Sequence, residues 1–351
     1  MHLIKPTHIL ALVRTAAACI LLLAAGGAAA AKTDVVLLVN GDAVTGEVKS
    51  LEFGSLSYGT DSMGTVSVDW VDVVALTSKQ TLQVEVTDGR RYFGTLATAG
   101  SLGQVRVSQG ESSYTLAIND VVRITPIDAD ESFWERVEGS LTFGFNTQKA
   151  SEVTTINLAA DIRYRTLDYL VGIKTNLTVT DQPSEETKAR ETVQVNYQRF
   201  RGNRWFTDWL ASHEKNDEQG IQSRVSAGAA LGRYLVQNNR NQFSLTGGVV
   251  ATRETFVGEE PSDTKPEGRV QVRYLHRSLE PDASASFTSN IYPLLEDLSE
   301  YRADTDLSFR REFIKDLFFD LTLWHSYLSD PPPDATGKVD YGITTSIGYS
   351  F

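Results

Sequence analysis

Histidine and serine residues are the first candidates for chemistry in this sequence. His213 follows Ser212, His325 precedes Ser326, and His276 is the remaining histidine beyond residue 31. A hydrolytic Ser–His pair needs both side chains on one face and an acceptor that orients the imidazole. Neighbouring residues on a strand point to opposite faces, and the sequence has no G-x-S-x-G motif. We therefore predict interfacial or packing histidines and no catalytic residue.

Charged residues at alternate positions are the second group of candidates. Asp304 and Asp306 stand two residues apart, a spacing that suits an acid pair, a cation site or, the reading we favour, a ladder of salt bridges with neighbouring arginines. On strands, these and further charged residues would share the inward face of a barrel. The residues that we expect on that face are Arg163, Lys174, Arg190, Arg224, Arg269, Arg273, Arg302, Asp304, Asp306 and Arg310. They would seal the interior with ion pairs or line a narrow water-filled path that favours anions.

The elements that must position these side chains are β-strands. Between residues 134 and 351, about twelve segments of about ten residues carry an apolar side chain at every second position, as transmembrane barrel strands do. The last segment is the clearest, with Tyr341, Ile343 and Ile347 on one face. No apolar run is long enough for a spanning helix. Hydrophobic and charged fractions of 41% and 22% likewise exclude a multi-helix membrane protein.

Loop lengths distinguish this barrel from a soluble sandwich, whose strands alternate in the same way. Connections expected on one side are short, as at 166–168 and 201–203. Those expected on the other side, such as 181–187, 257–267 and 329–337, are mostly longer, acidic and rich in Pro or Gly. Aromatic residues cluster beside the short turns, as in an interfacial girdle. We predict an all-β chain that ends in a transmembrane antiparallel barrel of about twelve strands.

The last predicted strand ends on aromatic residues. Tyr349 and Phe351 resemble the C-terminal signal that the barrel-assembly machinery reads in bacterial outer-membrane proteins. With ERVEGSLTFGFN at 135–146 and DYGITTSIGYSF at 340–351, the segment 134–351 resembles the YdiY-like family of salt-induced outer-membrane proteins, the domain-of-unknown-function family numbered 481. The resemblance implies an outer-membrane location and supplies no activity.

A tandem repeat with an offset of 48 residues precedes the barrel. Gly41 and Gly46 of the first unit correspond to Gly89 and Gly94 of the second, and we expect these glycines to serve turn geometry. Each unit contains two strands around an Asn-Gly or Asp-Gly turn, and such short units curl into small barrels. The pattern resembles Sm-like and SH3-like barrels, some of which bind RNA. Because this segment is acidic, we expect no nucleic-acid partner and favour a spacer or interaction module.

The first 31 residues have the features of a secretory signal peptide, with an apolar stretch followed by small residues. A lipoprotein anchor at Cys19 is the disfavoured alternative, because apolar residues continue after it. Cleavage would remove the only cysteine and change the formal charge from −12 to −14, since Lys5 and Arg14 are lost. The predicted organisation is a signal peptide at 1–31, small barrels at 32–79 and 80–128, a linker at 129–133 and the membrane barrel at 134–351.

These features together predict a non-enzymatic outer-membrane protein of a Gram-negative bacterium, with residues 32–128 in the periplasm. Its role would be structural or in envelope permeability, with a link to osmotic or salt stress that the resemblance alone suggests. A narrow small-solute or anion-preferring channel is the alternative, and a lipid-active enzyme is disfavoured. We expect contacts with outer-membrane lipid, the barrel-assembly machinery and a periplasmic partner of the repeats, and no cofactor or metal.

Overall fold

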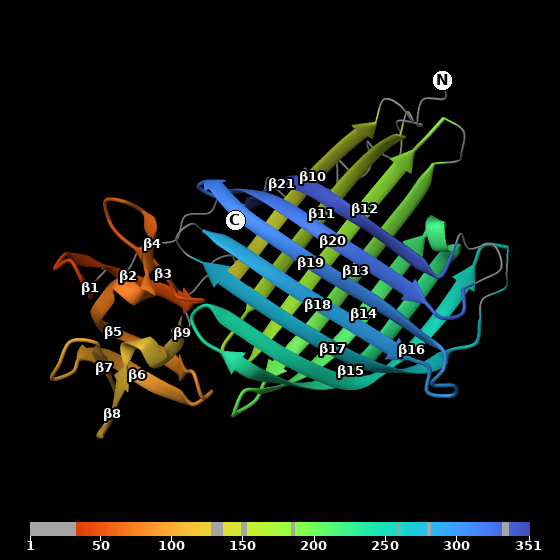
Figure 1. Cartoon of the computed structure of the whole chain (residues 1–351). Helices are drawn as coiled ribbons and strands as arrows, with labels where there is room; N and C mark the ends of the chain where they lie inside the picture. The colour runs from red at the N-terminus through yellow and green to blue at the C-terminus, as the bar shows by residue number, and fades with distance from the viewer. Residues whose placement is uncertain are drawn as a thin grey trace.

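Two β-sheet bodies make up the protein (Figure 1). The computed structural model describes residues 33–127, 136–148, 153–183, 187–258, 260, 262–278, 282–331 and 337–351. Residues 33–127 form a small body, which we call the N-terminal module, and residues 136–351 form a closed barrel. The predicted signal peptide at 1–31 and the predicted linker at 129–133 lie outside the described residues.

The N-terminal module repeats one pattern of strands. Its elements are β1 (Asp34–Leu38), β2 (Ala43–Glu52), β3 (Ser55–Gly59), β4 (Thr65–Asp69), η1 (Trp70–Asp72), β5 (Val73–Val86), β6 (Arg91–Thr98), β7 (Gln104–Gln109), β8 (Ser112–Ala117), η2 (Ile118–Asp120) and β9 (Val121–Pro126). Equivalent backbone hydrogen bonds recur 48 residues apart: Val39 N–H donates to the Asp72 carbonyl at 2.8 Å, and Thr87 N–H donates to the Asp120 carbonyl at 2.9 Å. The repeat in the sequence is therefore also a repeat in the structure.

Both repeats contribute to one closed ring of four strands. β1 pairs with β2 and β5, and β9 pairs with β5 and β2, so that the order β2–β1–β5–β9 returns to its start. Trp70 and Ile118 occupy equivalent positions in the two repeats, and the Trp70 indole N–H donates a hydrogen bond to the Ile118 carbonyl at 2.8 Å. A single apolar core includes Val36, Leu82 and Ile124. The predicted small-barrel fold is confirmed, but the two repeats share one closed ring and do not form the two separate barrels that were predicted, because β9 pairs with both β2 and β5. β5 runs through the expected boundary between residues 79 and 80.

Twelve antiparallel strands close the barrel. They are β10 (Val137–Gln148), β11 (Val153–Arg165), β12 (Tyr169–Asp181), β13 (Lys188–Phe200), β14 (Trp205–Asn216), β15 (Ile221–Gln237), β16 (Asn241–Phe256), β17 (Lys265–Ser278), β18 (Ala283–Pro293), β19 (Tyr301–Ile314), β20 (Leu317–Leu328) and β21 (Val339–Ser350), with the short helix η4 (Asp217–Gln219) before β15. β10 pairs with β21 at the seam. Gly139 and Phe351 extend this seam with two backbone hydrogen bonds of 2.9 and 3.0 Å. The predicted all-β fold and twelve-stranded antiparallel barrel are confirmed.

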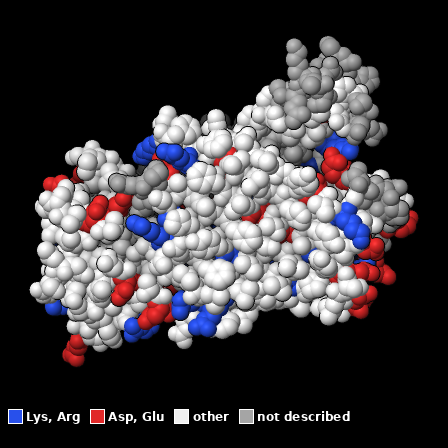
Figure 2. Space-filling model, in the orientation of Figure 1, with Lys and Arg blue, Asp and Glu red and all other residues white. Residues whose placement is uncertain are grey.

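The two ends of the barrel differ in their connections. At one end, the short-turn rim, no connection between strands is longer than four residues. At the other end, the long-loop rim, the connections after β16, β18 and β20 are longer. The N-terminal module and the C-terminus both lie at the short-turn rim (Figure 1). Acidic side chains gather at the long-loop rim, on the right in Figure 2, whereas the wall between the rims is mostly uncharged.

The barrel wall separates an apolar outer face from a polar inner face. On β19, Leu307 and Phe309 are each 45% exposed, and Ser308 and Arg310 point to the opposite side. The same alternation places exposed aliphatic side chains along β13, β15 and β21. A soluble sandwich would bury such a face against a second sheet, whereas here it lies on the outside of a closed barrel.

Candidate functional site

The inner face of the barrel, which we call the lumen, carries the charged residues that were predicted to share one face. The strand registers place all ten of them opposite the exposed apolar residues: Arg163, Lys174, Arg190, Arg224, Arg269, Arg273, Arg302, Asp304, Asp306 and Arg310. The polar residues between them are small or neutral, as with Thr192, Ser226 and Thr246. Chemistry in the lumen is therefore set mainly by how these charges pair.

In the half of the lumen toward the long-loop rim, two buried arginines hold several carboxylates. Arg224 donates to Glu214 at 2.9 Å and to Glu254. Arg302 makes two hydrogen bonds to Glu267, at 3.1 and 3.0 Å, and its guanidinium lies 3.7 Å from the centre of a tyrosine ring. Both arginine side chains are at most 9% exposed. Such fully paired buried charges brace the strands and leave little charge for a ligand.

The two carboxylates of the predicted acid pair, Asp304 and Asp306, lie in different environments. Asp304 accepts a hydrogen bond from the Ser326 hydroxyl at 2.8 Å and lies 3.6 Å from the Arg302 guanidinium. Asp306 makes no ion pair among the described residues. Within the described part of the chain no group of three or more His, Cys, Asp or Glu residues is arranged to hold a metal ion. The favoured ladder of salt bridges therefore fits Asp304 and does not extend to Asp306.

Three further arginines pair with aspartates on the inner wall. Arg269 meets Asp208 at 2.6 Å, and Arg310 lies 3.5 Å from Asp320. Arg163 makes two hydrogen bonds, of 3.0 and 2.8 Å, to Asp161, its second neighbour along β11. Each of these pairs neutralises one of the predicted basic residues.

Two of the predicted basic residues stay free of ion pairs in the part of the chain that the structure describes. Lys174 and Arg273 are both exposed, although both point inward. Arg273 lies within electrostatic reach of Arg163, Asp161 and Asp208, and Lys174 lies opposite Asp161 on the neighbouring strand. This stretch of the lumen therefore presents two water-accessible cations that the surrounding carboxylates do not pair with directly.

The N-terminal module meets the short-turn rim through a group of residues that we call the docking cluster: Glu52, Glu85, Arg123, Arg165 and Gln237. Arg123 of the module bridges Glu52 at 2.7 Å and Glu85 at 3.2 Å, and its side chain is 8% exposed. From the barrel, Arg165 reaches Glu52 at 3.9 Å and Gln237 donates to Glu85 at 3.4 Å. Two carboxylates of the module are thus shared between its own arginine and the barrel.

Electrostatics favour the charged form of the Glu52–Arg123 pair in this cluster. Burial by itself would raise the pKa of Glu52, but the positive charges of Arg123 and Arg165 outweigh it and lower the pKa to about 2. The same attraction raises the pKa of Arg123 in spite of its burial. Glu52 and Arg123 are therefore both charged at neutral pH.

Aromatic and backbone contacts accompany the docking cluster. Phe200, which is 8% exposed, lies 4.3 Å from the guanidinium of Arg165 and 5.9 Å from that of Arg91 in the module. The turn before β6 packs so closely on the barrel that a Cβ on Gly89 would come within 2.6 Å of Cγ of Arg204. The module therefore contacts the rim at the ends of β11, β13 and β15.

Comparison with known families agrees with this architecture. A family model described as "Protein of unknown function, DUF481" matches residues 141–351. The chain belongs to the DUF481 family. The match covers nearly all of the barrel, so the family resemblance seen in the sequence is confirmed, and the N-terminal module precedes the DUF481 region.

Several solved structures are similar to the DUF481 chain at low sequence identity. The NanC porin has 12% identity and a TM-score of 0.39, covering 61% of this chain and 98% of its own. The β-domain of the Bordetella autotransporter BrkA has 10% identity and a TM-score of 0.31, covering 62% and 99%. CdiB from Acinetobacter baumannii has 9% identity and a TM-score of 0.32, covering 78% and 66%. No curated protein matches. The assignment of the fold rests on the strand pairings.

His213 and His325 of the DUF481 barrel lack a complete hydrolytic triad among the described residues. His325 and Ser326 point to opposite faces, because Ser326 bonds Asp304 inside the lumen. His213 instead lies 3.2 Å from the hydroxyl of Ser223, a contact that the sequence did not indicate. Among the described residues no acceptor is bonded to the other ring nitrogen of His213, which a hydrolytic triad requires. Nor does any described helix have the length and apolar character needed to cross a membrane.

The docking cluster was not predicted from the sequence of this DUF481 protein. Glu85 lies between the buried residues Val84 and Val86, and Arg123 lies between Val122 and Ile124, which are also buried. A charged side chain inside a buried strand needs a partner of opposite charge. The positions of Glu85 and Arg123 between buried apolar residues were therefore the signal in the sequence that an ion pair forms there. The partners come from β2 and from the barrel, far away in the sequence, so that only the folded chain identifies them.

Proposed function

We propose that this DUF481 protein spans the bacterial outer membrane and contributes to the permeability of the envelope, with its N-terminal module in the periplasm. The observation that carries the proposal is the closed barrel with an exposed apolar outer face and a charged inner face. Only a bilayer covers such an outer face without a partner protein. Tyr349 and Phe351 at the closing seam would be the signal for barrel assembly.

The lumen favours small anions in this proposal. Lys174 and Arg273 supply water-accessible positive charge, and the ion pairs of Arg224 and Arg302 hold the wall around the path. The contacts of the docking cluster support a module that restricts the path at the short-turn rim. Among the described residues, neither His213 nor His325 belongs to a complete hydrolytic triad, and the role that we propose is non-enzymatic. The link to salt stress and a periplasmic partner of the module rest on the resemblance and on the exposed surface of the module.

Planar-bilayer recordings test the permeability role. We expect low conductance for the full chain and a several-fold higher conductance for the double variant Arg165→Ala with Gln237→Ala. These substitutions remove the barrel side of the docking cluster and leave the pairs of Arg123 inside the module intact. Lys215→Ala, a change at the opposite rim, is the matched control. Equal, negligible conductance of all three proteins, or fractionation with the soluble periplasm, would contradict the proposal.

A further inference from the structure

Three arginines near the short-turn rim point away from the lumen. Arg199 on β13, Arg233 on β15 and Arg311 on β19 lie on the outer face in the strand registers, and all three are exposed. None of them makes an ion pair in the part of the chain that the structure describes. An unpaired cation beside an apolar wall needs an anionic or aqueous partner at that level.

Each of these arginines faces an aromatic residue on the neighbouring strand. Arg199 is directly opposite Tyr169, Arg233 is opposite Trp205, and Arg311 is opposite Phe319. The guanidinium of Arg233 lies 5.3 Å from the centre of the Trp205 ring. Aromatic rings at this level mark the boundary between acyl chains and headgroups. The three pairs therefore place a cation where the headgroups of one leaflet begin.

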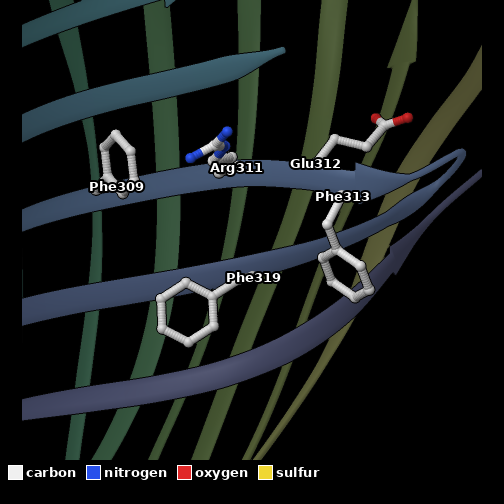
Figure 3. Close-up of a pocket in the computed structure, with 5 residues that line it drawn as sticks. All are labelled: Phe309, Arg311, Glu312, Phe313 and Phe319. Carbon is white, nitrogen blue, oxygen red and sulfur yellow. The ribbon is translucent and has the colours of Figure 1, made fainter. Parts of the chain in front are cut away.

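The pair of Arg311 and Phe319 lines a depression on the surface of the barrel. Phe309 and Phe313 on β19 and Phe319 on β20 line this depression together with Arg311 and Glu312 (Figure 3). The Glu312 carboxylate accepts a hydrogen bond from the backbone N–H of Asp316 at 3.2 Å. The three rings are 41–54% exposed. Apolar rings beside a planar cation with several N–H donors match an acyl chain that ends in a phosphate.

The opposite rim does not repeat this arrangement. Among the described residues near the long-loop rim, the charged side chains on the outer face belong to Asp181, Glu191, Lys215 and Arg253, a set of mixed sign. The outward arginines Arg199, Arg233 and Arg311 therefore lie at one end of the barrel, the end that bears the N-terminal module.

We infer that Arg199, Arg233 and Arg311, with their aromatic partners, bind the phosphate groups of anionic glycerophospholipids in the leaflet at the short-turn rim. The inference rests on the proposed membrane location and adds a ligand class and a leaflet to it. Phosphate binding by three arginines also fixes the height of the barrel in the bilayer and the orientation of the rim that carries the module.

Lipid selectivity of the full chain tests the inference. The protein is inserted into phosphatidylcholine vesicles that contain spin-labelled phosphatidylglycerol or spin-labelled phosphatidylcholine, and the relative association constant is obtained from the motionally restricted lipid. We expect wild type to prefer phosphatidylglycerol by about fivefold, with the preference lost at high salt. The triple variant Arg199→Gln, Arg233→Gln, Arg311→Gln should lower the ratio toward one. Arg253→Gln, an exposed outward arginine at the other rim, should leave it unchanged.

The possible failures can be told apart. Wild type that inserts and shows no preference, or a preference that Arg253→Gln removes equally, overturns the lipid site and leaves the membrane barrel standing. Wild type that inserts into neither kind of vesicle overturns the proposed function itself. If inorganic phosphate at constant ionic strength abolishes the preference, the arginines bind free phosphate and the assignment to lipid is wrong. Should the triple variant not fold, the single variant Arg233→Gln and the salt dependence of wild type still decide the outcome.

Discussion

At the scale of single residues, arginine makes the ion pairs that connect strands on the inner wall, because its planar guanidinium can donate to two acceptors at once. Arg224 joins carboxylates from β14 and β16, and Arg302 joins β17 to its own strand through Glu267 and Asp304. Lys174 and Arg273 lie in the same lumen and make no ion pair among the described residues. The lumen therefore contains two kinds of cation: paired arginines that brace the strands, and cations that are exposed to water.

Loss of a bracing arginine should destabilise the barrel strongly. Arg224→Met leaves the largely shielded Glu254 without its ion-pair partner and leaves Glu214 only the 4.0 Å contact with Arg190, so we expect the free energy of unfolding to fall by about 3–5 kcal/mol. Urea titration of the protein in vesicles, followed by tryptophan fluorescence, measures the change. Arg253→Met, on the exposed outer face of β16, should change it by less than about 0.5 kcal/mol. Equal effects of the two substitutions would mean that the buried pairs do not brace the wall.

At the scale of elements, Glu52 at the end of β2 and Glu85 near the end of β5 connect the module to the short-turn rim. Close packing in this module also requires glycine within strands. A Cβ on Gly46 would lie 2.5 Å from the carbonyl oxygen of Gly59, and one on Gly94 would lie 2.1 Å from that of Ser108. Gly41 and Gly89, with φ of +90° and +83°, do serve turns as expected. The glycine pattern of the repeat thus has two physical causes.

Acid should loosen the contact between β2 and β9. Because Arg123 and Arg165 lower the pKa of Glu52 from 4.5 to about 2, the charged carboxylate contributes stability that is complete above its ordinary pKa and is lost as the pH falls toward about 2. Amides of β2 and β9 should then gain exchange rate beyond the intrinsic pH effect between about pH 5 and pH 2. Hydrogen exchange with mass spectrometry on the full chain measures this. Glu52→Gln should exchange faster at neutral pH and lack the acid-dependent change; an unaltered pH profile in that variant would exclude Glu52 as the cause.

Across the whole molecule, the two rims carry different charge and different structure. The module and the outward arginines lie at the short-turn rim, and acidic side chains gather at the long-loop rim (Figure 2). Between the rims, Lys174 and Arg273 make no ion pair with any described residue, and both point into the lumen. A solute crossing the barrel would therefore meet acidic loops, then a basic stretch, and then the docked module.

Ion selectivity should depend on this basic stretch. In the background of Arg165→Ala with Gln237→Ala, adding Lys174→Gln and Arg273→Gln should lower the permeability ratio of chloride to potassium by about twofold or more. Reversal potentials across a salt gradient measure the ratio. Adding Arg253→Gln instead, outside the barrel, should leave the ratio unchanged. An unchanged ratio in the lumen variant would show that the paired charges, and not these two cations, set the selectivity.

Much of the architecture could be predicted because its signals are local. Alternation along β21, the short turns and the offset of 48 residues between the repeats each depend on a few neighbouring positions. These signals sufficed for an all-β chain, about twelve barrel strands and a small-barrel fold before them, although they predicted two small barrels where the repeats share one ring. They also excluded Ser326 as a partner of His325, because strand neighbours point apart.

Tertiary structure alone decided which of these residues meet. The stagger of twelve closed strands brings Arg269 to Asp208 across 61 positions of sequence, and the ring of the module brings Arg123 to Glu52 across 71. The sequence determined which face each side chain takes, since a strand has a period of two. It did not determine partners, because pairing across a barrel depends on closure and register, which no local pattern encodes. Hence Lys174 and Arg273 could be assigned to the lumen from the sequence, but only the fold shows that they are unpaired among the described residues.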